Sequence, residues 1–469
     1  MKDMTQGSPT RLLLIFSIPL LIGNLFQQLY NVSDTMIVGR TIGVEALAAL
    51  GACGPLFFSS MGIFFGLTSG FAVITAQRFG AHDMAGVKRS IAISLTLCLA
   101  STLLYMAVAI PLIRPMLELI HVPAGQMEDA YWYIAVIYWG IGAAVFYNMI
   151  SSIIRALGDS VTPLIFLAVA CLLNVGLDFC FILWLGWGVP GVAAATVIAQ
   201  VAAGAACLIY ARRKYRLLRL RRRDWVFEPS FVWAHLRVAL PMALQFAILG
   251  LGGFVQQRVL NELGANSIAA FTAGCKVDQL AIQPIFSFGV ALATFAAQNY
   301  GAGFKERIRQ GVRSCIAICA VVCALGCAGV LLFSGELSYL FVGEAVPEVH
   351  GKIRIFLLFN SFSYIILALI VIFRNAMQGM GHAFIATVSV GCELLARIFG
   401  AVFLAAWWGY VGVCAAGPFS WICGMIPMGI AYCWIMSRYH PMPRNRPLPE
   451  KATADGVLRD FIRKAETAV

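Results

Sequence analysis

The chain is poor in charged residues and lacks the residue patterns of enzyme and metal sites. Only 12% of its 469 residues are Asp, Glu, Lys or Arg, about half the share in soluble globular proteins. Its six histidines form no His-x-x-His pair, no Asp-rich motif occurs, and the 14 cysteines have neither zinc-finger nor redox spacing in a polar loop. Clustered nucleophiles and phosphate-binding loops are also missing. The sequence therefore argues against an enzyme and predicts neither a cofactor nor a metal centre.

Apolar residues make up 60% of the chain and occur in long runs. These runs lack the alternation of barrel strands, and the first residues show no cleavable signal peptide. At about 20 apolar residues per span, the runs predict an all-α integral membrane protein with twelve helices. We expect these helices near 11–38, 47–75, 88–113, 130–152, 161–185, 189–211, 236–260, 268–296, 309–333, 353–374, 384–408 and 410–437.

The two halves of the chain repeat one another. Ala76–His82 returns as Ala297–Gly303, so that Gln77 corresponds to Gln298. Duplicated apolar halves are typical of secondary transporters, with a binding site at their interface. We therefore predict two pseudo-symmetric six-helix bundles in residues 1–211 and 236–437, a basic cytoplasmic linker in 212–235 and a cytoplasmic tail in 438–469.

The net charge of +12 is concentrated on one side of the predicted membrane. Most Lys and Arg, including Arg374, fall in the even-numbered loops, the linker and the termini. The positive-inside rule then places both termini and the long middle loop in the cytoplasm. The Arg212–Arg223 run is predicted to face anionic membrane lipid rather than nucleic acid.

Ionisable residues within a bilayer are costly and are functional candidates by default. Asp34 closes the first predicted helix, and Gln27, Tyr30 and Asn31 precede it on one polar face. Pro19 lies deeper in the same helix, where its missing backbone N–H predicts a place to bend.

A second carboxyl group lies in the fifth predicted helix, where Asn174 is one turn before Asp178. Both helices start in the cytoplasm, so Asp34 and Asp178 are expected at similar depth in the outer half of the membrane. Two carboxyl groups with an amide can share a proton or hold Na⁺. The alternative is that each Asp only bonds to a neighbouring helix.

The second half carries weaker signals. Glu393 and Arg397 are one turn apart, which allows either a mutual ion pair or a place in the cavity wall. Gln256 corresponds to Asp34, and Asp178 corresponds to an apolar stretch, so ion coupling is expected in the first half only. Further candidates for a substrate path are Lys276, Asp278, Gln279 and Gln283.

From about residue 9 to about residue 437, the chain resembles the MATE (multidrug and toxic compound extrusion) transporters. The resemblance rests on several short motifs in order: Ile18-Pro19, Asn31–Asp34, Ala46–Gly51, Gln77–Ala81, Arg155–Asp159 and Asn174–Asp178. The first helix looks closest to the DinF-like bacterial branch. The resemblance implies a V of two bundles, with Asp34, Asn174 and Asp178 as the proton or sodium site and a bend of the first helix at Pro19. The second-half sodium site of the NorM-like branch is not expected, because the tenth helix has no acidic residue in its interior.

The predicted function is a cation-coupled antiporter, with H⁺ preferred to Na⁺, that exports amphipathic and often cationic compounds. One chain contains both bundles, so we expect a functional monomer. A lipid-linked sugar flippase of the same superfamily and a non-transporting membrane receptor are the alternatives.

Overall fold

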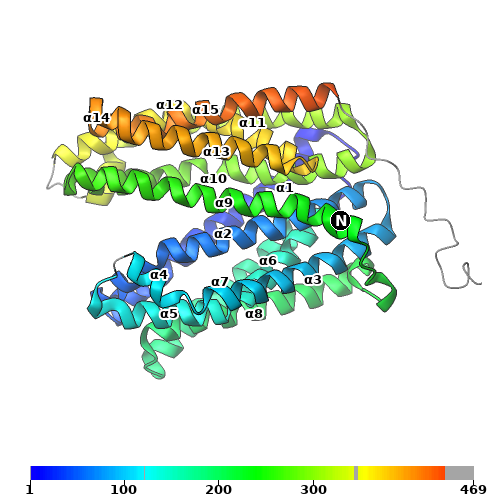
Figure 1. Cartoon of the computed structure of the whole chain (residues 1–469), viewed down its shortest axis with the longest axis horizontal. Helices are drawn as coiled ribbons and strands as arrows, with labels where there is room; N and C mark the ends of the chain where they lie inside the picture. The colour runs from blue at the N-terminus through cyan, green and yellow to red at the C-terminus, as the bar shows by residue number, and fades with distance from the viewer. Residues whose placement is uncertain (1, 121, 343–346, 439–469) are drawn as a thin grey trace, which may run out of the picture.

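The computed structural model describes residues 2–120, 122–342 and 347–438; the predicted tail falls almost entirely outside them. Its helices form two lobes (Figure 1). The first lobe, blue to green in Figure 1, contains α1 (Pro9–Thr41), α2 (Val44–Gly80), α3 (Met84–Ala109), α4 (Ile113–Leu119), α5 (Met127–Trp139), α6 (Ile141–Ala156), α7 (Val161–Phe179) and α8 (Gly188–Lys214). The second lobe, green to orange, contains α9 (Pro229–Glu262), α10 (Ala265–Ala302), α11 (Lys305–Val342), α12 (Pro347–Gly379), α13 (Ala383–Phe399), α14 (Ala405–Trp408) and α15 (Tyr410–Ser437).

The predicted all-helical membrane architecture is confirmed. Among the described residues, eleven helical segments are long and apolar enough to span a membrane. The pair α5 and α6, which bends by 46° at the break, is the candidate for a twelfth span. Gly140 lies at this break, where an added Cβ would come within 2.2 Å of Val197 on α8. The predicted helix 88–113 instead ends at Ala109, and α4 follows as a separate short helix.

The duplication is visible in an irregular turn that the sequence did not reveal. In each lobe, one α-helix passes into a π-helical turn, Cys180–Trp184 after α7 and Gly400–Leu404 after α13. Such turns are rare and often lie at functional sites. Here the first one begins two residues after Asp178.

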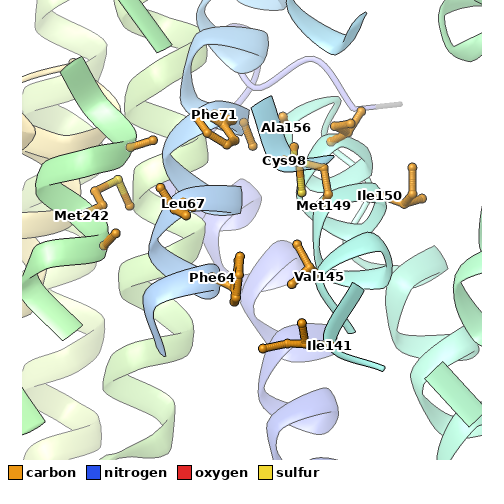
Figure 2. Close-up of a cluster of buried hydrophobic side chains, with 14 of the residues drawn as sticks. Phe64, Leu67, Phe71, Cys98, Ile141, Val145, Met149, Ile150, Ala156 and Met242 are labelled. Carbon is orange, nitrogen blue, oxygen red and sulfur yellow. The ribbon is translucent and has the colours of Figure 1, made fainter. Parts of the chain in front are cut away.

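Each lobe's core includes residues from the other half of the chain. The core of the first lobe joins α2, α3 and α6, and Figure 2 shows Met242 of α9 beside Leu67 of α2. The core of the second lobe takes in Leu13 and Phe16 from the start of α1. The lobes are therefore packed firmly together near the beginnings of α1 and α9.

The space around three glycines of α2 shows how the distance between α2 and α9 changes along the helices. A Cβ on Gly70 would lie 2.4 Å from the backbone of Ala239 on α9, and one on Gly62 would lie 3.0 Å from Phe246. At Gly54, farther along α2, no atom would lie within 4 Å. The two helices are thus in backbone contact at one end and separate toward the other, which gives a V.

The narrow end of the V is closed by two equivalent glutamines. Gln77 Nε2 on α2 donates to the Gly379 carbonyl of the second lobe at 2.8 Å. Gln298 Nε2 on α10 donates to the Ala156 carbonyl of the first lobe at 2.9 Å. Both side chains are buried, so each lobe binds the other's backbone through the same repeated residue.

The N-terminal segment crosses this closed end. Met4 is fully buried, and its N–H donates to Gln298 Oε1 at 2.9 Å. Its carbonyl accepts from Asn299 Nδ2 at 3.1 Å and from Arg307 Nη2 at 3.2 Å. On the other side, a Cβ on Gly158 would meet the Lys2 carbonyl at 2.0 Å. Residues 2–7 therefore contact both lobes.

The link between the lobes is fixed to the first lobe outside the membrane-spanning segments. Asp159, in the α6–α7 turn, accepts hydrogen bonds from Thr162 and from the Tyr215 hydroxyl. Lys214 Nζ lies 3.3 Å from the same carboxylate. Burial opposes ionisation of Asp159, but these bonds lower its pKa to about 2. A carboxylate thus holds the start of the linker.

Candidate functional site

Asp34, Asn174 and Asp178 meet in the interior of the first lobe. With its amide oriented to satisfy both carboxyl groups, Asn174 Nδ2 donates to Asp34 Oδ1 at 2.9 Å and to Asp178 Oδ2 at 3.2 Å. The two carboxyl groups also interact directly. Asn174 and Asp178 are fully buried, whereas Asp34 is partly exposed. The structure therefore brings together the three residues predicted for ion coupling.

The helices α1, α7 and α8 fix this arrangement. Asn174 and Asp178 are one turn apart on α7 and point to the same side. The Asn174 amide oxygen accepts from the backbone N–H of Thr196 on α8 at 3.2 Å. The amide is thus held from α8 while its nitrogen faces the carboxyl groups of α1 and α7.

The cluster is an acceptor site without a basic partner. Among the ion pairs of the described residues, none involves Asp34 or Asp178. Asp178 Oδ1 is buried and has no hydrogen-bond partner. A buried carboxyl oxygen left in this state gains most from binding a proton or a cation.

Tyr30 connects the cluster to a cavity. Its hydroxyl shares a hydrogen bond of 2.9 Å with the Thr196 hydroxyl, and its side chain also interacts with Asp34 one turn later on α1. The cavity has a volume of about 310 Å³. It is lined by Gln27, Tyr30, Asn31, Phe57, Phe58, Met61, Gly62, Phe65, Ile137, Gly140, Ile141, Ala144, Asn148, Thr196, Val197, Gln200 and Phe246.

The lining is mostly apolar and aromatic with a few amide and hydroxyl groups. Such walls accept amphipathic molecules of varied shape, because dispersion contacts are not directional. Gln27, Tyr30 and Asn31 were predicted to face a cavity from sequence. Gln200 on α8, whose buried Oε1 has no partner, and Thr196 were missed, since isolated neutral polar residues in an apolar helix give little signal.

The remaining predicted cavity residues lie elsewhere in the second lobe. Asp278 accepts a hydrogen bond from the Tyr364 hydroxyl at 2.8 Å. Gln256 Nε2 donates to the Val413 carbonyl at 3.4 Å. Lys276 and Gln279 are exposed on α10, and Gln283 is partly exposed on the same helix. None of these residues lines the first-lobe cavity.

Two sequence interpretations of the charges in the second lobe are wrong. Glu393 does not pair with Arg397; its carboxylate pairs with Arg374 of α12. Arg374 was assigned to a cytoplasmic loop, but α12 continues to Gly379 and carries Arg374 inside the lobe. Arg397 Nη2 instead lies 3.4 Å from the Ser420 hydroxyl of α15.

Pro19 lies within α1, which is one continuous helix from Pro9 to Thr41. Proline removes one hydrogen bond of the helix ladder, so α1 retains a weak point here even while it is continuous. The proposed bend at Pro19 stays a prediction.

Comparison with known proteins places this site in a family of transporters. A family model described as MatE matches residues 19–180 and 241–403, one segment in each lobe. The chain is 31% identical over 353 residues to the probable multidrug resistance protein YpnP of Bacillus subtilis, covering 75% of this chain and 78% of that protein. It is 24% identical over 438 residues to a FAD transporter of Shewanella oneidensis, covering 91% and 94%.

A solved structure gives the same result for the fold. It is described as the outward-facing conformation of a multidrug resistance MATE family transporter of the MOP superfamily. The TM-score is 0.85 at 25% identity, with 93% of this chain and 97% of that chain covered. The similarity thus extends over both lobes.

Proposed function

Because the chain belongs to the MatE family of multidrug transporters, we propose that it exports amphipathic, often cationic compounds from the cytoplasm in exchange for protons. The observation that carries this proposal is the buried carboxyl pair of Asp34 and Asp178 beside the apolar cavity. We propose that the chain belongs to the DinF-like branch, because of the amino-acid sequence of its first helix. The termini and the closed end of the V face the cytoplasm, so the cavity opens outward.

The small number of ligands in the cluster supports a proton rather than Na⁺ as the coupling ion. A hard cation such as Na⁺ needs several oxygen ligands at once, and the cluster brings together only two carboxyl groups and one amide. A proton needs only one free carboxyl oxygen, which Asp178 Oδ1 provides.

Transport would then follow from competition for the first-lobe site. Asp34 and Asp178 without protons attract a cationic cargo to the cavity beside Tyr30. Protons from outside neutralise the pair, which removes this attraction and the repulsion between the carboxyl groups. Bending of α1 near Pro19 then reduces the cavity and releases the cargo.

The test is efflux from proteoliposomes under an imposed proton or sodium gradient. Wild type is compared with Asp34→Asn and with Glu45→Gln, which removes an exposed carboxylate near the start of α2. The probes are a lipophilic cation and, because one relative is named a FAD transporter, an anionic dye. We expect proton-driven efflux of the cation by wild type and by Glu45→Gln, and its loss in Asp34→Asn.

Three other results would each contradict part of the proposal. Efflux driven by the sodium gradient alone would mean that Na⁺, and not a proton, is the coupling ion. Full proton-driven efflux by Asp34→Asn would remove the carboxyl pair from the mechanism. If neither gradient drives transport, the result would favour the lipid-linked sugar flippase. If the protein then only binds a soluble partner, it would favour the receptor.

A further inference from the structure

The interior of the second lobe carries an excess of positive charge. Arg374 and Glu393 form an ion pair whose side chains are 12% and 5% exposed. Arg397 follows Glu393 by one turn on α13 and has no ion pair among the described residues. This part of the lobe therefore holds two guanidinium groups and one carboxylate, which pairs with Arg374.

No other acidic group of the lobe compensates Arg397. Asp278, the other acidic residue in the predicted interior, accepts from Tyr364 rather than from an arginine. The groups that influence Arg397 electrostatically are Glu393, Cys275 and Arg374. Since Glu393 is already paired, the site retains a net positive charge. An uncompensated charge in a low-dielectric interior is unfavourable, so the structure favours an anion there.

The guanidinium of Arg397 is also short of hydrogen-bond acceptors. It has five N–H donors, and its one side-chain acceptor in the described residues is the Ser420 hydroxyl at 3.4 Å. A small space of about 10 Å³ beside it is bounded by Glu393 and by the apolar residues Ile248, Leu249, Gly252, Val390 and Leu394. Arg397 is partly exposed. Gly252 lies next to it, and a Cβ added at this glycine would lie 3.3 Å from Arg397 Cδ.

The ion-site region of the first lobe has the opposite polarity. Its buried atoms without a hydrogen-bond partner, Asp178 Oδ1 and Gln200 Oε1, are acceptors, whereas Arg374 Nε in the second lobe is a donor without one. Helix α9 joins the two regions, because Phe246 lines the first-lobe cavity and Gly252 contacts Arg397. These residues are about 9 Å apart along the helix axis and about 120° apart around it, so a cargo that reaches both must pass around α9.

We propose that Arg397 binds the carboxylate or phosphate of a zwitterionic cargo whose cationic end occupies the first-lobe cavity. The inference rests on the proposed function and narrows its substrate class from amphipathic cations to amphipathic zwitterions. A guanidinium suits this role because it forms paired hydrogen bonds to planar and tetrahedral oxyanions.

The test compares two dyes that differ in one group. Tetramethylrhodamine with its free carboxylate is a zwitterion, and its methyl ester is a cation of nearly the same shape. Initial rates of proton-driven export are measured for both dyes with wild type, Arg397→Gln and Arg354→Gln. The last variant removes one positive charge from an exposed site on α12 of the same lobe.

We expect Arg397→Gln to lower the ratio of zwitterion to ester export about tenfold or more, the change that loss of one charge-assisted hydrogen bond gives. Arg354→Gln should leave the ratio at the wild-type value. An equal loss for both dyes would mean that Arg397 only supports packing, and an unchanged ratio would mean that it binds no cargo anion. Either result overturns the inference.

A second variant tests the inference if Arg397→Gln fails to fold. Glu393→Gln frees Arg374 and should raise the ratio; a ratio at or below that of wild type would overturn the inference. Failure of the proposed function gives a different result, since wild type would then export neither dye. In that case, the affinities of the two dyes are measured by fluorescence anisotropy in detergent. Equal affinities of wild type for the two dyes would overturn the inference. Tighter binding of the zwitterion by wild type, with loss of this preference in Arg397→Gln, would support it.

Discussion

Replacement of both Gln77 and Gln298 by leucine should release the narrow end of the V. Each glutamine donates to a backbone carbonyl of the opposite lobe, at 2.8 Å and 2.9 Å. Leucine is similar in size but cannot donate, so each substitution leaves a buried carbonyl without its partner. At Gln298, the N–H of Met4 also loses its acceptor.

The magnitude follows from these buried groups. A buried polar group left without a partner costs about 1–3 kcal/mol. The two substitutions together should therefore favour the open form by about 2–6 kcal/mol, or at least about 30-fold in its population. Because the two contacts are equivalent by duplication, each single variant should produce a substantial part of this shift.

The assay is hydrogen–deuterium exchange of peptides from residues 2–8 and 298–304, measured by mass spectrometry. Protection of these amides reports the population of the open form, and we expect it to fall by the same factor of about 30 or more. Gln310→Leu, at an exposed position on α11 on the same side, is the control and should exchange like wild type. Exchange of the double variant at the wild-type rate would refute the view that the glutamine pair holds the lobes together.

Three further predictions concern packing, charge and helix shape. Gly70→Leu should destabilise the folded protein by about 1–3 kcal/mol, measured as a lower Tm, because its Cβ would lie 2.4 Å from Ala239. The pKa of Asp159, about 2, lies below the ordinary value of about 3.9, so its stabilisation is present above pH 4 and is lost as the pH falls toward 2. Asp159→Asn should therefore lower Tm at pH 6 but not at pH 2, and Tyr215→Phe should do so less. Pro19→Ala should raise Tm and slow proton-driven efflux, because it restores a backbone hydrogen bond; unchanged efflux would argue against a bend at this residue.

The fold could be predicted from sequence because a membrane span is a local property. Each run of apolar residues specifies its own helix, and the duplicated Gln77 and Gln298 motifs fixed the relation between the halves. Helix ends were less accurate, since α12 extends beyond its apolar run to Gly379. The charge of Arg374 was read as a loop signal, but its partner Glu393 allows it to lie inside.

The candidate ion site could be predicted in part for a similar reason. Asp34 and Asp178 were visible because charges are rare in apolar helices, and equal depth followed from the direction of the chain. Thr196, which holds the Asn174 amide, could not be found, because it does so through its backbone N–H. A backbone donor has no sequence signature, so only the packing of α7 on α8 reveals it.

The same distinction explains what the duplication has kept and what it has changed. The contacts of Gln77 and Gln298 end on backbone carbonyls, which any residue supplies, so substitutions in the opposite lobe leave them intact. The sites inside the lobes depend on side chains on both partners, and there a single substitution removes or inverts a charge. Closure at the narrow end can therefore stay symmetric while the first lobe gathers carboxyl groups around Asn174 and the second gathers guanidinium groups around Glu393.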